Sequence, residues 1–154
     1  MSGEHPDNEQ FEFQKQCVLE AIEYAKGYKN ITFEWLPLDP DHHIAKRKLY
    51  REAKALLKTT IFNEPFGLSQ VEALACGTPV IAYKYGSMPE IIKNGITGFV
   101  RNNNMKNICT AIDMIDIIKP ENCRKDAIER FDIKIMAKNY LSKYQDILDN
   151  RGWS

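Results

Sequence analysis

The sequence lacks several features that mark whole classes of protein. No apolar run approaches the roughly 18 residues that a membrane-spanning helix needs. Residues 1–7 show neither the basic nor the apolar region of a signal peptide. Neither sign of charge is in excess, because 21 basic and 21 acidic residues give a formal net charge of zero. We therefore expect no transmembrane segment and no nucleic-acid partner, since binding to phosphates by counterion release needs a basic surface.

Cysteine and histidine are also sparse, and neither forms a recognisable ligand pattern. The four cysteines are Cys17, Cys76, Cys109 and Cys123, with no Cys-x-x-Cys pair. This spacing predicts reduced, mostly buried thiols in a cytoplasmic protein. We expect a cytoplasmic location, which includes a position peripheral to the inner membrane face. His42 and His43 follow two aspartates, but adjacent side chains rarely reach one ion, so we expect no metal site.

What is present fits an ordinary globular domain. The chain has 154 residues, of which 44% are hydrophobic and 27% charged. A chain of this length buries enough surface to fold without disulfides. We therefore expect one domain over residues 1–154.

Helical and strand patterns alternate along the chain. Helices are expected over residues 13–26, 44–52, 66–76, 88–93, 105–115 and 121–130, and from Asp132 onward. Strands are expected over residues 31–36, 53–62, 80–83 and 97–100, with a buried run at 55–57. The last helix is expected to bury Ile133, Met136, Ala137, Tyr140, Leu141, Tyr144, Ile147 and Leu148. This alternation predicts an α/β fold, a Rossmann-like parallel sheet flanked by helices.

The loop that joins the expected strand 53–62 to the helix 66–76 carries the clearest candidate site. Parallel sheets bind ligands in such loops, at the carboxyl ends of their strands. Gly67 removes a side chain where the backbone enters the helix, so a ligand can approach closely. The amides of Gly67, Leu68 and Ser69 lie at the positive end of the helix dipole, which favours an anion.

Two carboxylates flank this predicted anion site. Glu64 precedes the helix and Glu72 falls in its second turn, where both can face one ligand. Because a carboxylate accepts hydrogen bonds from two vicinal hydroxyls, ribose and hexose are natural ligands. The pattern indicates a nucleotide or sugar-phosphate site. In the alternative interpretation, Glu64 helps to cap the helix and Glu72 is a solvated surface residue.

The segment at residues 64–72, Glu-Pro-Phe-Gly-Leu-Ser-Gln-Val-Glu, resembles the Glu-x7-Glu motif of retaining glycosyltransferases of the GT-B type. Three further blocks follow in order: Ala-Leu-Ala-Cys-Gly-Thr-Pro-Val-Ile-Ala at 73–82, Gly-Ser-Met-Pro-Glu-Ile-Ile at 86–92, and Gly-Ile-Thr-Gly-Phe-Val at 95–100. Together they resemble the carboxy-terminal, donor-binding lobe of the group 1 (family 4) enzymes. The resemblance is dense over residues 50–100 and weaker on either side.

The resemblance implies roles for the matching residues. Glu64 would be the catalytic residue beside the reacting carbon, and Glu72 would bind the ribose hydroxyls. The remaining donor-binding residues would be Phe66, Gly67, Leu68 and Ser69, and the base would lie near residues 35–38. The implied reaction transfers a hexose from a nucleotide-diphosphate sugar to a glycan, lipid or small-molecule acceptor with retention of configuration. No metal or other cofactor is implied, because the helix end and basic side chains take the phosphate charge.

The resemblance covers only part of such an enzyme. From the resemblance we expect the amino-terminal acceptor lobe to be absent, and the donor-binding lobe to be truncated on its amino-terminal side, without two strands and an Arg-x4-Lys loop. We therefore expect no transfer by this chain alone, with the missing lobe or another chain completing the sheet as its partner. A non-catalytic module that binds a nucleotide sugar or a partner protein is the alternative, and a product with no ligand is a third. The sequence leaves the sugar, base, acceptor and oligomeric state open.

Overall fold

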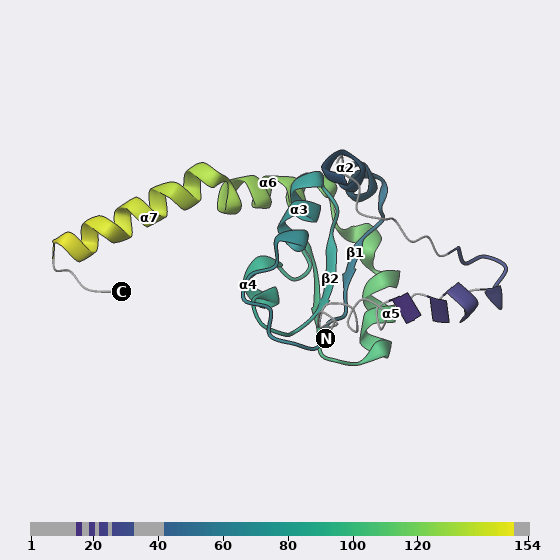
Figure 1. Ribbon diagram of the computed structural model, residues 1–154. Coiled ribbons are helices and arrows are strands. Elements are labelled where there is room, and N and C mark those ends of the chain that lie inside the picture. The colour runs from purple at the N-terminus through teal and green to yellow at the C-terminus, as the bar shows by residue number, and fades with distance from the viewer. Residues whose placement is uncertain (1–14, 17–18, 21, 25, 33–41, 150–154) are drawn as a thin grey trace, which may run out of the picture. The chain divides into compact units, whose positions relative to one another are not determined.

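The computed structural model describes residues 15–16, 19–20, 22–24, 26–32 and 42–149 (Figure 1), and the chain divides into two compact units, Met1–Pro40 and Asp41–Ser154. In the first unit the described residues from 15 to 26 are helical, as predicted. The hydroxyls of Tyr24 and Tyr28 lie 2.8 Å apart near the end of this helix. Ile31 and Thr32, the first residues of the predicted strand 31–36, are not in a strand. The rest of that predicted strand lies outside the described residues, and so do residues 35–38, near which the base is expected.

The second unit alternates helices and strands. Its elements are α2 (His42–Glu52), β1 (Leu56–Lys58), α3 (Leu68–Cys76), β2 (Val80–Tyr83), α4 (Met88–Ile91), β3 (Gly98–Arg101), α5 (Met105–Asp113), the 3-10 helix η1 (Ile115–Ile117), α6 (Pro120–Phe131) and α7 (Ile133–Leu148). The strands form a parallel sheet in the order β1-β2-β3. The predicted α/β class, with a Rossmann-like parallel sheet flanked by helices, is confirmed.

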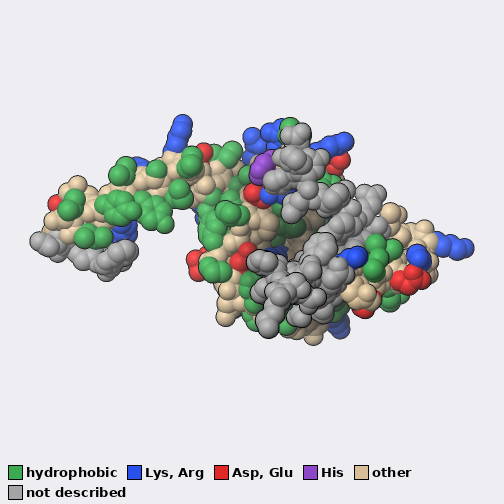
Figure 2. All heavy atoms as spheres, in the orientation of Figure 1, with side chains coloured by type: hydrophobic (Ala, Val, Ile, Leu, Met, Phe, Trp, Pro, Cys, Tyr) green, Lys and Arg blue, Asp and Glu red, His purple; other side chains and the backbone are tan. Residues whose placement is uncertain are grey.

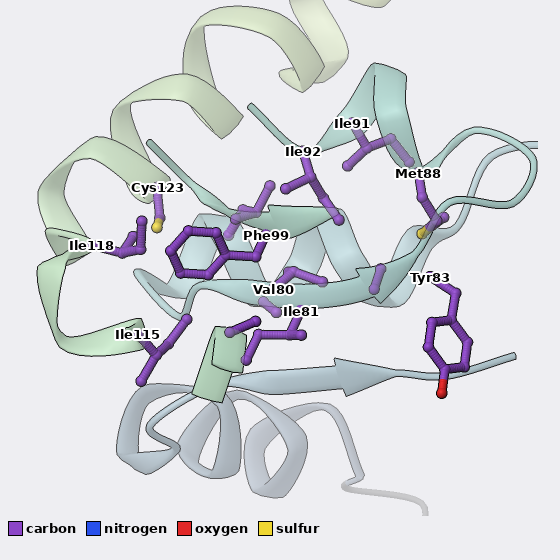
Figure 3. Packing of buried hydrophobic residues seen from close by; sticks show 14 of the residues in the cluster. Val80, Ile81, Tyr83, Met88, Ile91, Ile92, Phe99, Ile115, Ile118 and Cys123 are labelled. Atoms are coloured by element: carbon purple, nitrogen blue, oxygen red, sulfur yellow. The ribbon is translucent and has the colours of Figure 1, made fainter. Parts of the chain in front are cut away.

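The hydrophobic core lies around the central strand (Figure 3). All four residues of β2 are buried, so helices and loops cover both faces of this strand. Helix α5 packs against β2 and β3, α3 contacts β2, and α6 packs on α3. The largest fully buried apolar side chains are Leu74, Val80, Ile81, Ile91, Ile108 and Cys123. The core therefore holds β2 and α3 in a fixed relation, which positions the loop that precedes α3.

The predicted burial of the cysteines is only partly right. Cys76, Cys109 and Cys123 are free thiols, and of these only Cys123 is buried. Cys109 is exposed because Ile108 and Ala111 form the buried face of α5. Cys17 lies outside the described residues.

The predicted strand 53–62 is shorter and less buried than expected. Only Leu56–Lys58 forms β1, and the side chain of Leu57, which we expected to be buried, is 48% exposed. In the described sheet β1 is an edge strand, and its burial alternates along the chain. The side chains on one face of β1 are therefore partly covered, and Leu57 on the other face is exposed. A short apolar run in the sequence does not show which of its residues will be covered.

The predicted burial of the last helix is wrong in this structure. Asp132 caps α7 as predicted, since its side chain accepts the backbone N–H of Lys134 at 2.8 Å. However, α7 has no buried residue. Figure 1 shows α7 leading away from α6, and Figure 2 shows apolar side chains along its surface. The exposed residues are Ile133, Met136, Ala137, Tyr140, Leu141, Tyr144, Ile147 and Leu148. The apolar spacing predicted the helix and its face correctly, but not what covers that face.

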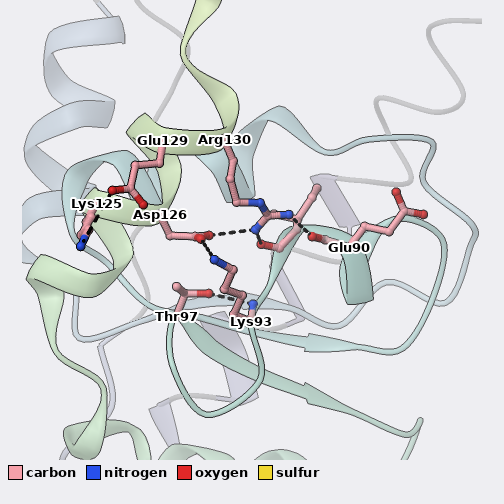
Figure 4. Close-up of polar contacts among 8 residues, drawn as sticks. Glu90, Lys93, Thr97, Lys125, Asp126, Glu129 and Arg130 are labelled. Carbon is pink, nitrogen blue, oxygen red and sulfur yellow. Dashed lines mark hydrogen bonds and ion pairs between the residues drawn. The ribbon is translucent and has the colours of Figure 1, made fainter. Parts of the chain in front are cut away.

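A buried carboxylate ties α6 to the segment between α4 and β3 (Figure 4). Asp126 is 5% exposed and forms ion pairs with Lys93 and, at 2.9 Å, with Arg130. Arg130 also donates to the carbonyl of Ile91 at 3.2 Å and to that of Glu90. The last carbonyls of α4 thus have a guanidinium partner, which anchors α4 against α6.

Candidate functional site

Of the predicted site residues, Glu64, Phe66 and Gly67 lie in the loop between β1 and α3. Leu68, Ser69 and Glu72 lie in α3 itself. Helix α3 begins at Leu68, two residues later than predicted, because Gly67 is its N-cap with φ 99° and ψ 77°. A Cβ on Gly67 would lie 2.5 Å from Oε1 of Gln70 and 3.1 Å from Cε of Met88. The left-handed backbone therefore favours glycine here, and a larger residue would also require the end of the Gln70 side chain to move.

The start of α3 offers backbone donors. No side chain of the described residues caps this helix, which leaves the amides from Leu68 onward to face a ligand. Ser69 donates its hydroxyl to Oε1 of Gln70 at 2.9 Å. Gln70 is fully buried, and its Nε2 has no hydrogen-bond partner among the described residues. Phe66 lies before the helix, where its ring contacts Phe131 edge-on at 5.8 Å.

The loop between β2 and α4 forms hydrogen bonds to the loop that carries Glu64. The backbone N–H of Gly86 donates to Oδ1 of Asn63 at 3.0 Å, and that of Ser87 donates to the carbonyl of Glu64 at 3.1 Å. The Ser87 hydroxyl donates to the carbonyl of Phe66. A Cβ on Gly86 would lie only 2.6 Å from the backbone nitrogen of Glu64. These contacts fix the backbone of Glu64 relative to the sheet.

Glu64 forms an ion pair with Lys58, the last residue of β1. The Nζ of Lys58 lies 2.9 Å from Oε2 of Glu64, and the two side chains are 21% and 23% exposed. The Oε2 atom itself is buried and makes no further hydrogen bond in the described structure. Lys58 also lies 5.8 Å from the ring centroid of Phe62. Sequence reasoning missed Lys58, although it directly follows the apolar run at 55–57, at the carboxyl end of the strand.

Glu72 forms a second ion pair, with Lys46 of α2. The Nζ of Lys46 lies 2.9 Å from Oε2 and 3.1 Å from Oε1 of Glu72. Burial raises the pKa of the Tyr50 hydroxyl, and the nearby Glu72 carboxylate raises it further. Glu72 thus lies in the second turn of α3 as predicted, at the contact with α2. Sequence reasoning missed Lys46 because it is 26 positions away along the chain.

The loop, the helix start and the two carboxylates therefore belong to one β1-α3 unit. The structure places Glu64 before Gly67, and Leu68 and Ser69 in the first turn of α3. Phe66 and Leu68, on either side of Gly67, expose apolar side chains. In chemical terms the unit offers backbone donors for an anion and two carboxylates, each already held by a lysine.

A comparison with family models identifies the group. Residues 20–130 match the model described as glycosyl transferases group 1. The chain belongs to this family. Its described Glu-x7-Glu segment, Gly86 turn and β3 all fall within the matched residues.

Individual glycosyltransferases align with parts of the chain. An uncharacterized glycosyltransferase of Methanocaldococcus jannaschii is 30% identical over 114 residues, which are 69% of this chain and 29% of that protein. A D-inositol 3-phosphate glycosyltransferase of Mycobacterium tuberculosis is 44% identical over 61 residues, 40% of this chain and 12% of that protein. The chain thus spans under a third of the length of these relatives.

Solved structures share the fold over part of their length. A glycosyltransferase from Rickettsia africae superposes with a TM-score of 0.71 and 29% identity, covering 88% of this chain and 37% of that one. The Anabaena protein HepE, in complex with UDP and glucose, gives a TM-score of 0.64 and 25% identity, with 87% and 38% coverage. These matches agree with the three parallel strands and flanking helices described above.

Two further properties bear on the site. Within residues 15–32 and 42–149, so far as they are described, no helix is long and apolar enough to cross a bilayer. The same residues contain no group of three or more His, Cys, Asp or Glu side chains placed to hold a metal ion.

Proposed function

We propose that the chain is the donor-binding part of a retaining glycosyltransferase, which holds a nucleotide-diphosphate sugar for transfer of its hexose to a glycan, lipid or small-molecule acceptor. The observation that carries this proposal is the uncapped start of α3, with Gly67 as its N-cap, between Glu64 and Glu72. A helix start without a side-chain cap suits a diphosphate, and carboxylates suit the hydroxyls at either end of the donor. The family and the complex of HepE with UDP and glucose support the same ligand class.

In the proposed arrangement each part of the donor has a partner in the β1-α3 unit. Glu72 accepts hydrogen bonds from the ribose hydroxyls. Glu64 accepts from the transferred hexose and lies beside its reacting carbon. The amides of Gly67, Leu68 and Ser69 stabilise the diphosphate, which takes the electron pair of the bond to the sugar as that bond breaks. The acceptor hydroxyl bonds to the same carbon and gives its proton to the leaving diphosphate. Phe66 and Leu68 flank this position with apolar surface.

We further propose that this chain alone does not complete the transfer. It spans 29% of the archaeal relative, so the acceptor side of such an enzyme is supplied by a further lobe or chain. Transfer requires donor and acceptor to be held in a closed, water-excluding site, which one lobe does not form. We place the protein in the cytoplasm or at the inner membrane face, in agreement with its free thiols.

Thermal unfolding with nucleotides tests the donor site directly. The purified chain is heated with UDP, GDP or ADP and with their glucose and mannose conjugates. A ligand at 100 times its dissociation constant stabilises the folded state by about 2.7 kcal/mol. We expect one nucleotide series to raise the unfolding temperature, and the Glu72→Ala variant to lose that increase.

The matched control is Glu129→Ala, which removes a carboxylate from an exposed pair with Lys125 on α6. This variant is expected to keep the full response to the nucleotide. If no nucleotide or nucleotide sugar stabilises the wild-type chain, the proposed donor site is wrong. Sugar transfer by the purified chain would contradict the proposal that a further lobe is required.

A further inference from the structure

The two carboxylates of the candidate site are held by their lysines in different ways. Lys46 lies across both oxygens of Glu72, at 2.9 Å and 3.1 Å, and both side chains of this pair are more than a third exposed. Lys58 contacts only Oε2 of Glu64, at 2.9 Å, in a pair that is less than a quarter exposed. The Glu64 pair is therefore the more desolvated of the two.

Because Oε2 of Glu64 is buried, its contact with Lys58 determines how the Glu64 carboxylate is oriented. An ionised oxygen withdrawn from water is costly unless a cation or donor faces it. Oε2 is buried, and within the described structure the Lys58 ammonium is the only cation beside it. With Oε2 fixed in this way, the 23% of the Glu64 side chain that remains exposed lies on its other atoms. The second oxygen, Oε1, accepts no hydrogen bond from any of the described residues, so it is the acceptor that this carboxylate offers to a ligand.

Lys58 is itself held in place by its surroundings. It is the last residue of β1, and its backbone is in register with Ala82 of the fully buried strand β2. Its ammonium also lies 5.8 Å from the ring centroid of Phe62, within the range of a cation–π contact. The backbone of Glu64 is fixed separately by Ser87. Lys58 is therefore anchored in the sheet, and Glu64 is anchored to the loop that follows β2.

We propose that Lys58 is a positioning residue that orients Glu64 toward the sugar of the donor, and that it thereby sets the preference of this site for a nucleotide sugar over the bare nucleotide. The inference rests on the proposed donor site and adds a residue to it. Lys46 acts differently, because Glu72 faces the ribose, which the nucleotide and the nucleotide sugar share.

The test compares the affinity of the 154-residue chain for each nucleotide with its affinity for the corresponding sugar conjugate. Isothermal titration is carried out with UDP and UDP-glucose, GDP and GDP-mannose, and ADP and ADP-glucose. The variants are Lys58→Met, which keeps an apolar stem without the charge, and Lys58→Arg, which keeps a cation. Lys54→Met is the matched control, since Lys54 forms a pair of the same 2.9 Å length with Asp116 on the exposed surface.

For the nucleotide series that binds, we expect wild type to prefer the sugar conjugate. In Lys58→Met this preference falls about tenfold, the scale of one hydrogen bond to a charged group, while affinity for the bare nucleotide stays within twofold. Lys58→Arg restores most of the preference, and Lys54→Met does not change it. Lys46→Met weakens both ligands by the same factor, because the ribose is common to them.

The outcomes separate the inference from the function on which it rests. If wild type binds no nucleotide and no conjugate, the donor site and the role of Lys58 are both wrong. If wild type binds nucleotides but Lys58→Met keeps the full preference, or wild type has no preference, only the role of Lys58 is wrong. Urea denaturation monitored by circular dichroism establishes that each variant is folded, and Lys58→Gln replaces Lys58→Met if the latter is not.

Discussion

Replacing Gly86 with alanine tests how tightly the β2-α4 loop holds the loop that carries Glu64. A Cβ at Gly86 would lie 2.6 Å from the backbone nitrogen of Glu64 and 2.9 Å from the carbonyl carbon of Asn63. Ordinary van der Waals contact begins at 3.4 Å. Because both neighbours are backbone atoms, no side-chain rotation relieves the overlap, and the two loops must separate by about 1 Å.

Gly86→Ala is expected to lose stability for two reasons, backbone strain and steric overlap. A substitution at a second glycine, Gly95, measures the backbone strain alone. Gly86 has φ 52°, so alanine costs about 1 kcal/mol of backbone strain there. The steric overlap adds about 2 kcal/mol, the middle of the range for overpacked sites. Gly95 has φ 80° but no atom within 4 Å of its Cβ position, so Gly95→Ala bears only the strain of about 1 kcal/mol.

Urea denaturation measures both variants against wild type. We expect Gly86→Ala to lose about 3 kcal/mol of unfolding free energy and Gly95→Ala about 1 kcal/mol. Gly86→Ala should also bind nucleotide sugars less tightly, since a 1 Å shift of Glu64 spoils its hydrogen-bond geometry. Equal losses of unfolding free energy in the two variants would refute the reasoning, because they would show that the backbone of Asn63 and Glu64 moves away from the added Cβ without cost.

The remaining predictions concern substitutions at Thr78 and Asn104 and the thiol of Cys123. Thr78→Val removes the hydroxyl that donates to the carbonyl of Tyr50 and should cost about 1 kcal/mol by urea denaturation, without changing the fold. Asn104→Ala removes the N-cap of α5 and should cost about 1 kcal/mol, whereas Asn104→Asp should be nearly neutral in the same assay. Burial raises the pKa of the Cys123 thiol to about 11, so at pH 8 a thiol reagent should label exposed Cys109 first and Cys123 only on unfolding. The pKa of Cys123 is higher in the folded than in the unfolded protein, so its contribution to the free energy of unfolding is complete below pH 9 and is lost as the pH rises toward 11. Urea denaturation at pH 8 and at pH 10.5 measures this loss.

Local chemistry explains what the sequence predicted well. The glycines and prolines that punctuate the chain mark the ends of helices, and Asp132 was recognised as a cap from its own position. The carboxylate-glycine-carboxylate spacing around Gly67 defines the candidate site within one stretch of sequence, because the loop, the N-cap and the first two turns of α3 are consecutive. The roles of these residues stay predictions. The start of α3 was still misplaced by two residues, since Gly67 takes a left-handed conformation that ends the loop there.

Contacts between distant segments explain what the sequence did not predict. Lys46 reaches Glu72 only because α2 packs against α3, and no local pattern contains that packing. Lys58 was assigned to a strand, but its partner Glu64 lies beyond a loop whose path depends on Gly86. The burial of Leu57 was overestimated for a related reason, since an apolar residue in a strand is buried only if another element covers its face.

The edge-on contact between Phe66 and Phe131 links the end of α6 to the candidate loop. Phe131 is the last residue of α6, and α7 begins two residues later, after its cap Asp132. The neighbouring Arg130 bonds to the carbonyl of Ile91 in α4 and to Asp126, so the end of α6 is held to the body of the second unit. The point from which α7 departs is therefore in ring contact with the residue that precedes Gly67.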